Sequence, residues 1–472
     1  MAKSIAKSRF YGRLDPQLSP ETATLKLSAI LSGLSYALDL TEGHPRGHAS
    51  RSCLIGMRIA GVLGLSPDDQ SHLFYALLLK DAGCSSNSAR VFQLFGGDDQ
   101  KAKRGVWLRD WRKLREQLAY VLDYVEPDGP IGERLRRLIV LAAKGPAARR
   151  SLFEVRCDRG AEIARTLGFS NDTADAIRTM DEHWDGGGYP AGLKRQDIPL
   201  LARIIGLAQV AEIFSSDSGP DRAASIVNQR RGSWFDPEIA DAFLAVVKDS
   251  TLWDACGSPS LDDTVAAAEP EGREVAADGA RLDDIASAFA RVIDAKSPYT
   301  YHHSTRVAEF AVAIGRELGL DAAEIVRIRR AGLLHDLGKL SVPNRILDKP
   351  GALTPREWEV VKLHPYYTYQ ILERVPVFGE LAFDASAHHE RLDGRGYYRN
   401  LPASQLSKAA RILAAADQLD ALSAERPYRG RLPRERVVSI MKEEAGTGLC
   451  PECVAAAVAV LERMPGDPLP QQ

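Results

Sequence analysis

A histidine beside a carboxylate marks the part of this sequence that could do chemistry. His335 and Asp336 end the apolar run from Ala331 to Leu334, and Lys339 follows three residues later. Adjacent helical residues project about 100° apart, and a carboxylate has two oxygens, so such a pair can serve two metal ions. Further candidate ligands lie on both sides of it: His303, His364, His388, His389 and Asp417. This inventory predicts a dinuclear metal site with open positions for water and substrate.

These candidate ligands would be costly to bury without partners. The pair His388 and His389 and the lone Asp417 stand in apolar, helix-forming segments. An imidazole or carboxylate that leaves water needs a cation or a hydrogen-bond partner, so the set favours metal binding over separate core residues. His302, which precedes His303, is better explained as a hydrogen-bonded or simply exposed histidine.

Composition narrows the class of protein. A chain of 472 residues is too long for one ordinary core and predicts about two or three domains. Basic and acidic residues nearly cancel, at 61 against 63, which argues against nucleic acid as a partner. No apolar run approaches the roughly 18 to 20 residues of a membrane span, the N-terminus lacks a signal-peptide core, and the six cysteines are mostly scattered. We therefore expect a cytoplasmic protein without a membrane partner.

Apolar spacing predicts the fold class. Apolar residues recur every three and four positions along most of the chain, as from Val307 to Leu320, and alternating strand patterns are scarce. The fold is therefore predicted to be all-α. Residues 256–282 are polar and contain glycine and proline, which predicts a linker. We expect domains at residues 20–255 and 283–465, as two tandem helical bundles.

The two predicted domains resemble each other in sequence. Leu201–Gln209 parallels Ala409–Asp417, and three further landmarks match in the same order, which favours a tandem duplication. Other residue types replace the candidate ligands in the first copy: Lys80, Arg156, Met180, Asp181 and Gln209. Only His48 and Asp81 keep ligand character there, beside a lysine, so the first domain is predicted to be metal-free.

The first domain also carries an insertion, at about residues 96–146. Its segment Trp107–Arg115 mixes arginine and lysine with tryptophan and leucine, which predicts a basic amphipathic helix. A helix of this kind more often packs or contacts a partner protein than binds nucleic acid. A homodimer or another protein partner through the first domain is therefore an open alternative.

On these motifs the second half resembles the HD-GYP family, a branch of the HD metal-dependent phosphohydrolases. The resemblance covers about residues 283–465 and rests on His303–Val307, His335–Lys339, Ile346–Gly351, His364–Pro365, His388–Glu390, Asp393–Tyr397 and Arg426–Arg429. It implies a phosphodiesterase of bacterial second-messenger signalling. The implied substrate is cyclic di-GMP or a related cyclic dinucleotide, cleaved to linear pGpG and further to GMP.

The resemblance also implies roles for single residues. The family's metal ligands match His303, His335, Asp336, His364, His388, His389 and Asp417, with Asp336 bridging a dinuclear centre of iron or manganese. Lys339 matches the lysine that faces the phosphodiester, which makes it a catalytic residue together with Asp336. Gly396 and Tyr397 match the loop that meets the substrate. Arg426 and Arg429 match positions that bind its phosphate and guanine.

Two positions depart from the family pattern. Tyr398 follows Gly396 and Tyr397 where the family has a proline that would restrict φ. Tyr299 stands where some members place a glutamate for a third metal, so we expect two metals. Two other functions stay open: a cyclic-dinucleotide receptor without turnover, and an HD phosphohydrolase for another nucleotide. Metal analysis with a turnover assay would distinguish them.

Overall fold

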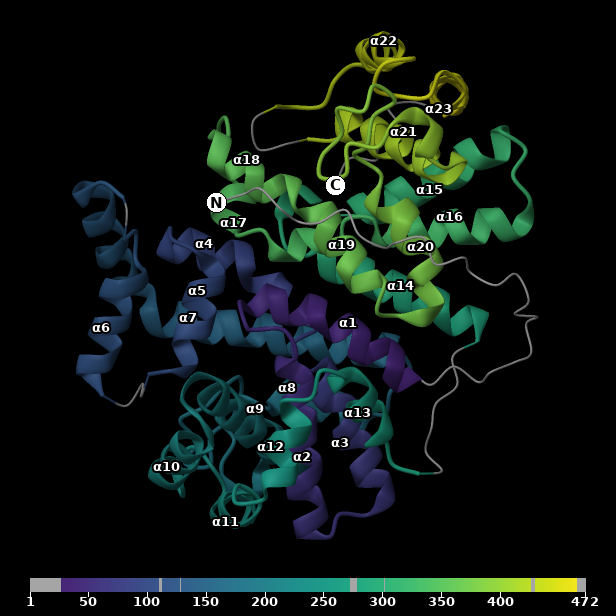
Figure 1. Cartoon of the computed structure of the whole chain (residues 1–472). Helices are drawn as coiled ribbons and strands as arrows, with labels where there is room; N and C mark the ends of the chain where they lie inside the picture. Colours follow the sequence, from purple (N-terminus) through teal and green to yellow (C-terminus); the bar gives the residue numbers. More distant parts are fainter. Residues whose placement is uncertain are drawn as a thin grey trace.

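The chain folds into helices that form an upper and a lower group in Figure 1. The computed structural model describes residues 27–109, 113–127, 129–271, 278–300, 302–425 and 429–464. Within these ranges there is no β-strand, only isolated bridges, so the predicted all-α class is confirmed. No helix among them is long and apolar enough to cross a membrane.

The lower group holds the helices of the first half. Their bounds are α1 (Leu27–Glu42), α2 (His48–Leu63), α3 (Pro67–Leu79), η1 (Cys84–Asn87), α4 (Ser88–Phe95), α5 (Asp99–Trp107), α6 (Leu114–Tyr124), α7 (Ile131–Thr166), α8 (Asn171–Thr179), η2 (Arg195–Asp197), α9 (Leu200–Ser218), α10 (Pro220–Arg230), α11 (Pro237–Val246), α12 (Ser250–Cys256) and α13 (Leu261–Ala267).

The upper group holds the helices of the second half. Their bounds are α14 (Gly279–Asp294), η3 (Pro298–Thr300), α15 (His303–Glu317), α16 (Ala322–Leu334), η4 (Leu337–Ser341), α17 (Asn344–Leu347), α18 (Pro355–Lys362), α19 (His364–Leu372), α20 (Pro376–Ser386), η5 (Ala403–Gln405), α21 (Lys408–Ser423), α22 (Arg434–Glu444) and α23 (Pro451–Arg463).

Local sequence explains where several of these helices begin and end. Asp321 and Glu324 form a capping box at the start of α16, which satisfies amide groups that a helix leaves free at its first turn. Gly64 ends α2 in the left-handed region, at φ 67°, where glycine is tolerated best. These signals fix the ends of helices, and the ends carry most of the candidate ligands.

The two halves repeat one packing scheme. Helices α2, α3, α8, α9, α10 and α11 pack on one another as α15, α16, α20, α21, α22 and α23 do. A matching turn closes each copy: the Trp184 amide donates to the Trp234 carbonyl, and the Leu392 amide donates to the Gly448 carbonyl. The repeated contacts between distant elements agree with the predicted duplication.

The segment predicted as a linker is partly helical. Helix α13 lies inside residues 256–282 and packs on α1 and α2. Just after it, Glu269 is buried and accepts a hydrogen bond from Ser28 at 2.8 Å. The expectation of a wholly polar linker was therefore wrong for this stretch, because a short apolar face and one buried carboxylate were enough to dock it.

The predicted helix over Trp107–Arg115 is also wrong in its position. Helix α5 ends at Trp107 and α6 begins at Leu114, and residues 110–112 lie outside the described residues. Residues 108, 109 and 113 therefore lie outside both helices. Local charge and apolar spacing did not reveal that Trp107 would turn into the core, where only 7 % of it is exposed.

Helix α1 joins the two halves into one body. It packs on α2 and α3 below and on η4 and α19 above, as Figure 1 shows. Gln100 of α5 donates both to the Leu40 carbonyl and to the Leu340 carbonyl, each at 3.0 Å. Buried apolar residues of both halves form one continuous core. The second half therefore rests on the first along α1 and α5.

Candidate metal centre

The candidate ligands come from helix ends that converge in the second half. They lie at the first residue of α15 (His303), the junction of α16 and η4 (His335 and Asp336), the first residue of α19 (His364), the turn after α20 (His388 and His389) and the middle of α21 (Asp417). All seven are buried except His389, whose side chain is 25 % exposed. The fold thus brings together every ligand that the sequence predicted.

Asp336 lies at the centre of this cluster. One carboxylate oxygen, Oδ2, is 3.2 Å from His303 Nε2 and 3.4 Å from His335 Nε2. The other, Oδ1, is 3.3 Å from His364 Nε2 and 3.6 Å from His388 Nε2. Each oxygen therefore faces its own pair of imidazoles, which is the arrangement that a bridging carboxylate requires.

Asp417 is the second carboxylate of the cluster and shares two imidazoles with Asp336. Its Oδ1 is 3.3 Å from His303 Nε2 and 3.8 Å from His335 Nε2, and its Oδ2 is 3.8 Å from His389 Nδ1. Ligand atoms of His303, His335 and Asp417 lie within 4.8 Å of one another, and so do those of His364, His388 and His389. The donors thus divide into two neighbouring groups.

Hydrogen bonds behind the cluster orient the imidazoles. Three of them donate Nδ1–H to the carbonyl three residues earlier: His335 to Gly332, His364 to Val361 and His388 to Ala385, at 2.6 to 2.7 Å. His303 donates its Nδ1–H to Asp420 at 2.6 Å. Each bond fixes the tautomer in which the Nε2 lone pair points at the centre, as metal-binding histidines need.

The donor set fits a metal centre. His303 Nε2, His335 Nε2 and Asp336 Oδ1 are buried and have no hydrogen-bond partner among the described residues. An unpaired buried polar atom costs about 1 to 3 kcal/mol, and a cation at each group would satisfy these atoms. Five imidazoles with two carboxylates suit iron or manganese better than calcium or magnesium, which prefer oxygen ligands.

Most groups of the cluster are in the form that binds metal, and His303 is the exception. Burial lowers the pKa of His303, but hydrogen bonds to Asp336, Asp417 and Asp420 raise it to about 10. Burial lowers the pKa of His364 and His388 and holds that of His389 well below its usual range, so these rings are neutral. Burial alone would raise the pKa of Asp336, but nearby His335 and Lys339 hold it well below its usual range. An ionised carboxylate beside the neutral rings of His364 and His388 can receive a cation, which would displace the proton of His303.

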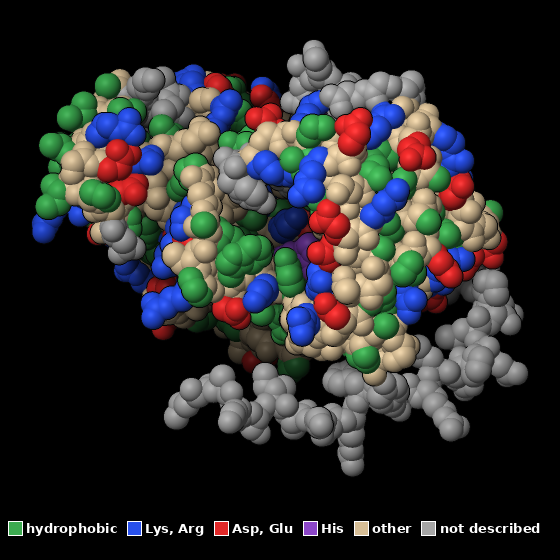
Figure 2. All heavy atoms as spheres, turned by 90° about the horizontal axis from the view of Figure 1, so that it is seen from above, with side chains coloured by type: hydrophobic (Ala, Val, Ile, Leu, Met, Phe, Trp, Pro, Cys, Tyr) green, Lys and Arg blue, Asp and Glu red, His purple; other side chains and the backbone are tan. Residues whose placement is uncertain are grey.

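Lys339 and the loop after His389 border the centre. The Lys339 ammonium contacts Asp336 Oδ2, and its side chain is 17 % exposed. Tyr397 stacks on His389, with ring centroids 4.4 Å apart and planes at 30°. The partly exposed side chains of Lys339 and His389 make the centre accessible on one face. Figure 2 shows a hollow with histidine atoms at its floor, beside a lysine or arginine side chain.

The Gly396–Tyr398 loop is fixed by contacts that replace the missing proline. A Cβ on Gly396 would lie 2.2 Å from Glu390 Oε2, so only glycine fits there. Glu390 also accepts the Leu401 amide at 3.0 Å. The Tyr398 ring packs edge-on to Tyr366, with centroids 5.8 Å apart. In this protein side-chain packing restricts the loop. In the family pattern the fixed φ of a proline would do so.

Only one of the two predicted substrate arginines is described by the structure. Arg426 lies outside the described residues. Arg429 donates to the Ala421 carbonyl at 2.8 Å, near the end of α21, rather than to any candidate ligand. Their predicted role in holding phosphate and guanine stays a prediction.

Sequence reasoning missed Asp420, whose carboxylate accepts a hydrogen bond from His303 and so orients its ring. Asp420 stands one turn after Asp417 on α21, is fully buried, and also accepts from Arg306 Nε at 2.5 Å. The spacing of three residues between two aspartates in an apolar helix was the available signal. The first half has the corresponding arrangement of a histidine and an arginine on one buried carboxylate. Arg51 Nε donates to Glu212 at 2.6 Å, and His48 contacts the same carboxylate.

Two cations occupy the corresponding region of the first half. The Lys80 ammonium donates to His48 Nε2 at 2.8 Å and contacts Asp81. The Arg156 guanidinium lies 2.7 Å from Asp181. Fixed side-chain charges thus pair with the groups that correspond to metal ligands in the second half.

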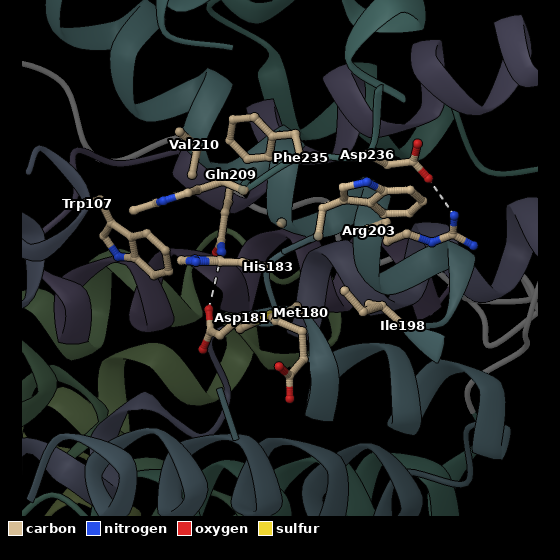
Figure 3. A pocket seen from close by; sticks show the side chains of 14 residues that line it. Trp107, Met180, Asp181, His183, Ile198, Arg203, Gln209, Val210, Phe235 and Asp236 are labelled. Atoms are coloured by element: carbon tan, nitrogen blue, oxygen red, sulfur yellow. Dashed lines mark hydrogen bonds and ion pairs between the residues drawn. The ribbon is translucent and has the colours of Figure 1, made fainter. Parts of the chain in front are cut away.

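Figure 3 shows a small pocket beside Asp181 in this region of the first half. The Gln209 amide points at Asp181, to which it donates at 3.5 Å, and Met180 lies beside them. The enclosed space is about 20 Å³, which holds no more than a water molecule or so. Glu42, Asp81 and Cys84 also come within coordinating range of one another, but Glu42 already pairs with Lys103 at 3.3 Å.

Comparison with known proteins agrees with this fold and site. The family model described as HD domain matches residues 143–239 and 287–451, that is, a segment in each half. The chain belongs to this HD-domain family, and the resemblance to HD-GYP proteins is confirmed.

Three relatives illustrate the range of the family. The 3′3′-cGAMP-specific phosphodiesterase 3 of Vibrio cholerae is 40 % identical over 94 % of this chain and 96 % of its own length. A cyclic di-GMP phosphodiesterase of Thermotoga maritima is 38 % identical over 33 % of this chain and 43 % of its own. A crystal structure of a cyclic GMP-AMP-specific phosphodiesterase from Vibrio cholerae is 37 % identical, with a TM-score of 0.65, over 93 % of this chain and 98 % of its own.

Proposed function

We propose that this protein is a metal-dependent phosphodiesterase that hydrolyses a 3′,3′-linked cyclic dinucleotide. The observation that carries the proposal is that each carboxylate oxygen of Asp336 faces its own pair of imidazoles. The proposed ligands are the seven residues of the cluster, and the proposed cofactor is a dinuclear centre of iron or manganese.

The sequence motifs favoured cyclic di-GMP, and the comparisons move 3′3′-cGAMP ahead of it. The relative that matches along 94 % of this chain is named as specific for cGAMP. The cyclic di-GMP phosphodiesterase of Thermotoga maritima matches over 33 % only. Because the first half is part of the longer match, cGAMP is the better-supported substrate, with cyclic di-GMP second.

The residues of the site divide the work of hydrolysis. Water adds across one P–O3′ bond, and the product is a linear dinucleotide. A bound dinuclear metal supplies Lewis acidity and lowers the pKa of water. Lys339 lies at the open face, where its ammonium can balance the charge that develops on a phosphoryl oxygen or protonate the leaving 3′ oxygen. Tyr397 forms a wall beside His389 against which a base can lie.

A matched pair of variants tests the proposal. Asp336→Asn removes the bridging charge from the second half, and Asp81→Asn makes the same change at the corresponding position of the first half. We expect oxygen-free preparations of wild type and Asp81→Asn to hold about two iron or manganese ions per chain. Both should linearise 3′3′-cGAMP, and Asp336→Asn should lose metal and activity together.

The readout is metal quantification with chromatography of the products from 3′3′-cGAMP, cyclic di-GMP and cyclic di-AMP. A wild-type protein that holds its metal and binds a cyclic dinucleotide without cleaving it would be a receptor, and the enzymatic proposal would be wrong. Faster cleavage of cyclic di-GMP than of cGAMP would overturn the substrate assignment alone.

A further inference from the structure

The first half contains a large cavity that the proposed phosphodiesterase site does not use. Its volume is about 820 Å³. Its walls come from α4, α5, α6 and α7, which Figure 1 shows at the outer side of the first half, and from the turn after α8. Cavities of about 300 to 1,000 Å³ are typical of small-molecule sites.

The wall of this cavity is predominantly apolar. Leucine and valine side chains of α4, α6 and α7 line it, together with aromatic rings of Phe95, Trp107, Tyr120, Phe153, Tyr189 and Trp234. Phe153 and Tyr189 stack in parallel, with centroids 4.8 Å apart and planes at 10°. Such a wall binds apolar or aromatic bodies by removing their surface from water.

The charged residues at the floor of the cavity neutralise one another. Arg156 pairs with Asp181 at 2.7 Å and lies 3.6 Å from Glu42, and Glu42 pairs with Lys103 at 3.3 Å. Asp185 adds one more carboxylate to the lining. The lining therefore has no excess of positive charge. A cyclic dinucleotide, with a negative charge on each of its two phosphates, would find no compensating charge in it.

Three buried polar atoms of the lining residues have no hydrogen-bond partner among the described residues. They are Glu42 Oε1, which lies 3.3 Å from the Lys103 ammonium, Asn87 Oδ1, an acceptor, and Arg156 Nε, a donor. The Arg156 guanidinium also lies over the rings of Trp107 and Phe153, 5.5 and 5.7 Å from their centroids. A ligand with a single neutral polar group could satisfy one of these atoms without bringing a charge.

The mouth of the cavity exposes apolar surface. Leu114, Leu118 and Leu122 recur every four residues on α6, line the cavity, and are 68 %, 55 % and 53 % exposed. An apolar ligand bound there would cover part of this exposed surface. The removal of that apolar surface from water would favour binding.

We propose that this cavity binds one uncharged, largely apolar small molecule, and that it is not a second cyclic-dinucleotide site. The volume of the cavity limits the size of the ligand, and the apolar wall favours an apolar one. The charged lining residues pair with one another, so they leave no positive charge to bind a strong anion. The first half would then be a small-molecule binding domain built on a degenerate copy of the enzyme fold.

A matched pair of fluorescent probes tests the charge argument on the full-length protein. N-phenyl-1-naphthylamine is neutral, and 8-anilino-1-naphthalenesulfonate carries the same rings with a sulfonate. We expect the neutral probe to bind with one site per chain and at least tenfold more tightly than the sulfonate. Equal or tighter binding of the sulfonate would overturn the proposal.

Variants place the probe in the cavity. Leu118→Arg puts a cation at the mouth, and Val62→Arg makes the same change at a position on α2 that is equally exposed, at 55 %, and does not line the cavity. Leu138→Trp adds volume from α7 without charge. The first and third changes should weaken binding of the neutral probe at least tenfold, and Val62→Arg should change it less than twofold, with unaltered circular dichroism.

Other occupants give different results. Displacement of the neutral probe by 3′3′-cGAMP or cyclic di-GMP in the Asp336→Asn variant would show a dinucleotide site. A dimer that Leu118→Arg converts to monomer, with no probe bound to either form, would show that a second copy covers α6. Either result would contradict the small-molecule proposal.

Discussion

Asp420 shows how a residue that touches no metal can set the orientation of a ligand. It accepts the Nδ1–H of His303 and is held from the other side by Arg306. In the first half, where side-chain cations stand in place of candidate ligands, Glu212 makes the same contacts with His48 and Arg51. The duplication therefore supplies an internal control for the role of this carboxylate.

We expect Asp420→Asn to weaken metal binding by about 10- to 100-fold, because residues behind a metal-binding histidine fix its tautomer and basicity. Equilibrium dialysis against iron or manganese measures the change. Glu212→Gln, the corresponding change in the first half, should leave the metal content as in wild type. Equal metal loss in both variants would show that the carboxylates act only through overall stability.

Lys339 is the cation nearest the open face of the centre, and its removal should affect turnover more than binding. We expect Lys339→Met to lower kcat on the cyclic dinucleotide by about 10²- to 10³-fold, as loss of one stabilising donor does in other enzymes. Metal content, measured on the same preparation, should be retained. A fall in metal content that matches the fall in kcat would instead assign Lys339 to holding Asp336.

At the scale of elements, η4 connects the metal centre to the first half. It follows Asp336 directly, carries Lys339, and its Leu340 carbonyl accepts from Gln100 of α5 and from Lys296 at 3.1 Å. Lys296 is fully buried, and this burial lowers its pKa to about 8. A buried lysine thus contacts the element that carries Lys339, the proposed catalytic residue.

The depressed pKa of Lys296 makes stability depend on pH. Between pH 8 and 10.5 the unfolded chain binds the proton that folded Lys296 has lost, so this lysine makes the free energy of unfolding rise with pH. Its contribution should be about 2 to 3 kcal/mol, since one pKa unit corresponds to about 1.4 kcal/mol. It is measured as the difference between wild type and Lys296→Met, because buried cysteines with raised pKa lower the free energy of unfolding over the same range. Urea unfolding at pH 8 and pH 10 measures it. Lys296→Met should lose this part of the slope, and an unchanged slope would contradict the assignment.

At the scale of the whole molecule, α1 fastens one half to the other. Gly33 lies in the middle of α1, and a Cβ there would come 2.8 Å from Val375 Cγ2 and 3.2 Å from the Arg374 carbonyl oxygen. The close approach of α1 to the end of α19 therefore depends on the missing side chain. Leu34 of α1 and Val375 belong to the same buried apolar cluster.

We expect Gly33→Val to destabilise the protein by about 1 to 3 kcal/mol, the usual cost of overpacking. Gly61→Val is the matched control, because Gly61 is an exposed helical glycine with no atom within 4 Å of its Cβ position. That change should alter the free energy of unfolding by no more than about 0.5 kcal/mol. Thermal and urea unfolding compare the two, and equal effects would show that α1 does not hold the halves together.

Much of the site could be predicted because its signals are local. Ligand types, their order and the two-copy pattern are all visible in short motifs such as His335–Asp336 and His388–His389. The helical class follows from apolar spacing within single elements. The helix expected at Trp107–Arg115 and the linker expected at 256–282 failed because the packing of Trp107 and α13 depends on surfaces far away in sequence.

The sequence by itself determined an all-helical, duplicated chain with an intact set of candidate metal ligands in its second copy. Only the tertiary structure decided which oxygen of Asp336 faces which imidazoles, that Asp420 stands behind His303, and that Lys80 and Arg156 pair with the remaining carboxylates of the first copy. It also decided that an apolar cavity lies beside that copy and that α1 unites the halves. These features join residues that are tens to hundreds of positions apart, and such distances are set by packing between elements rather than by local sequence.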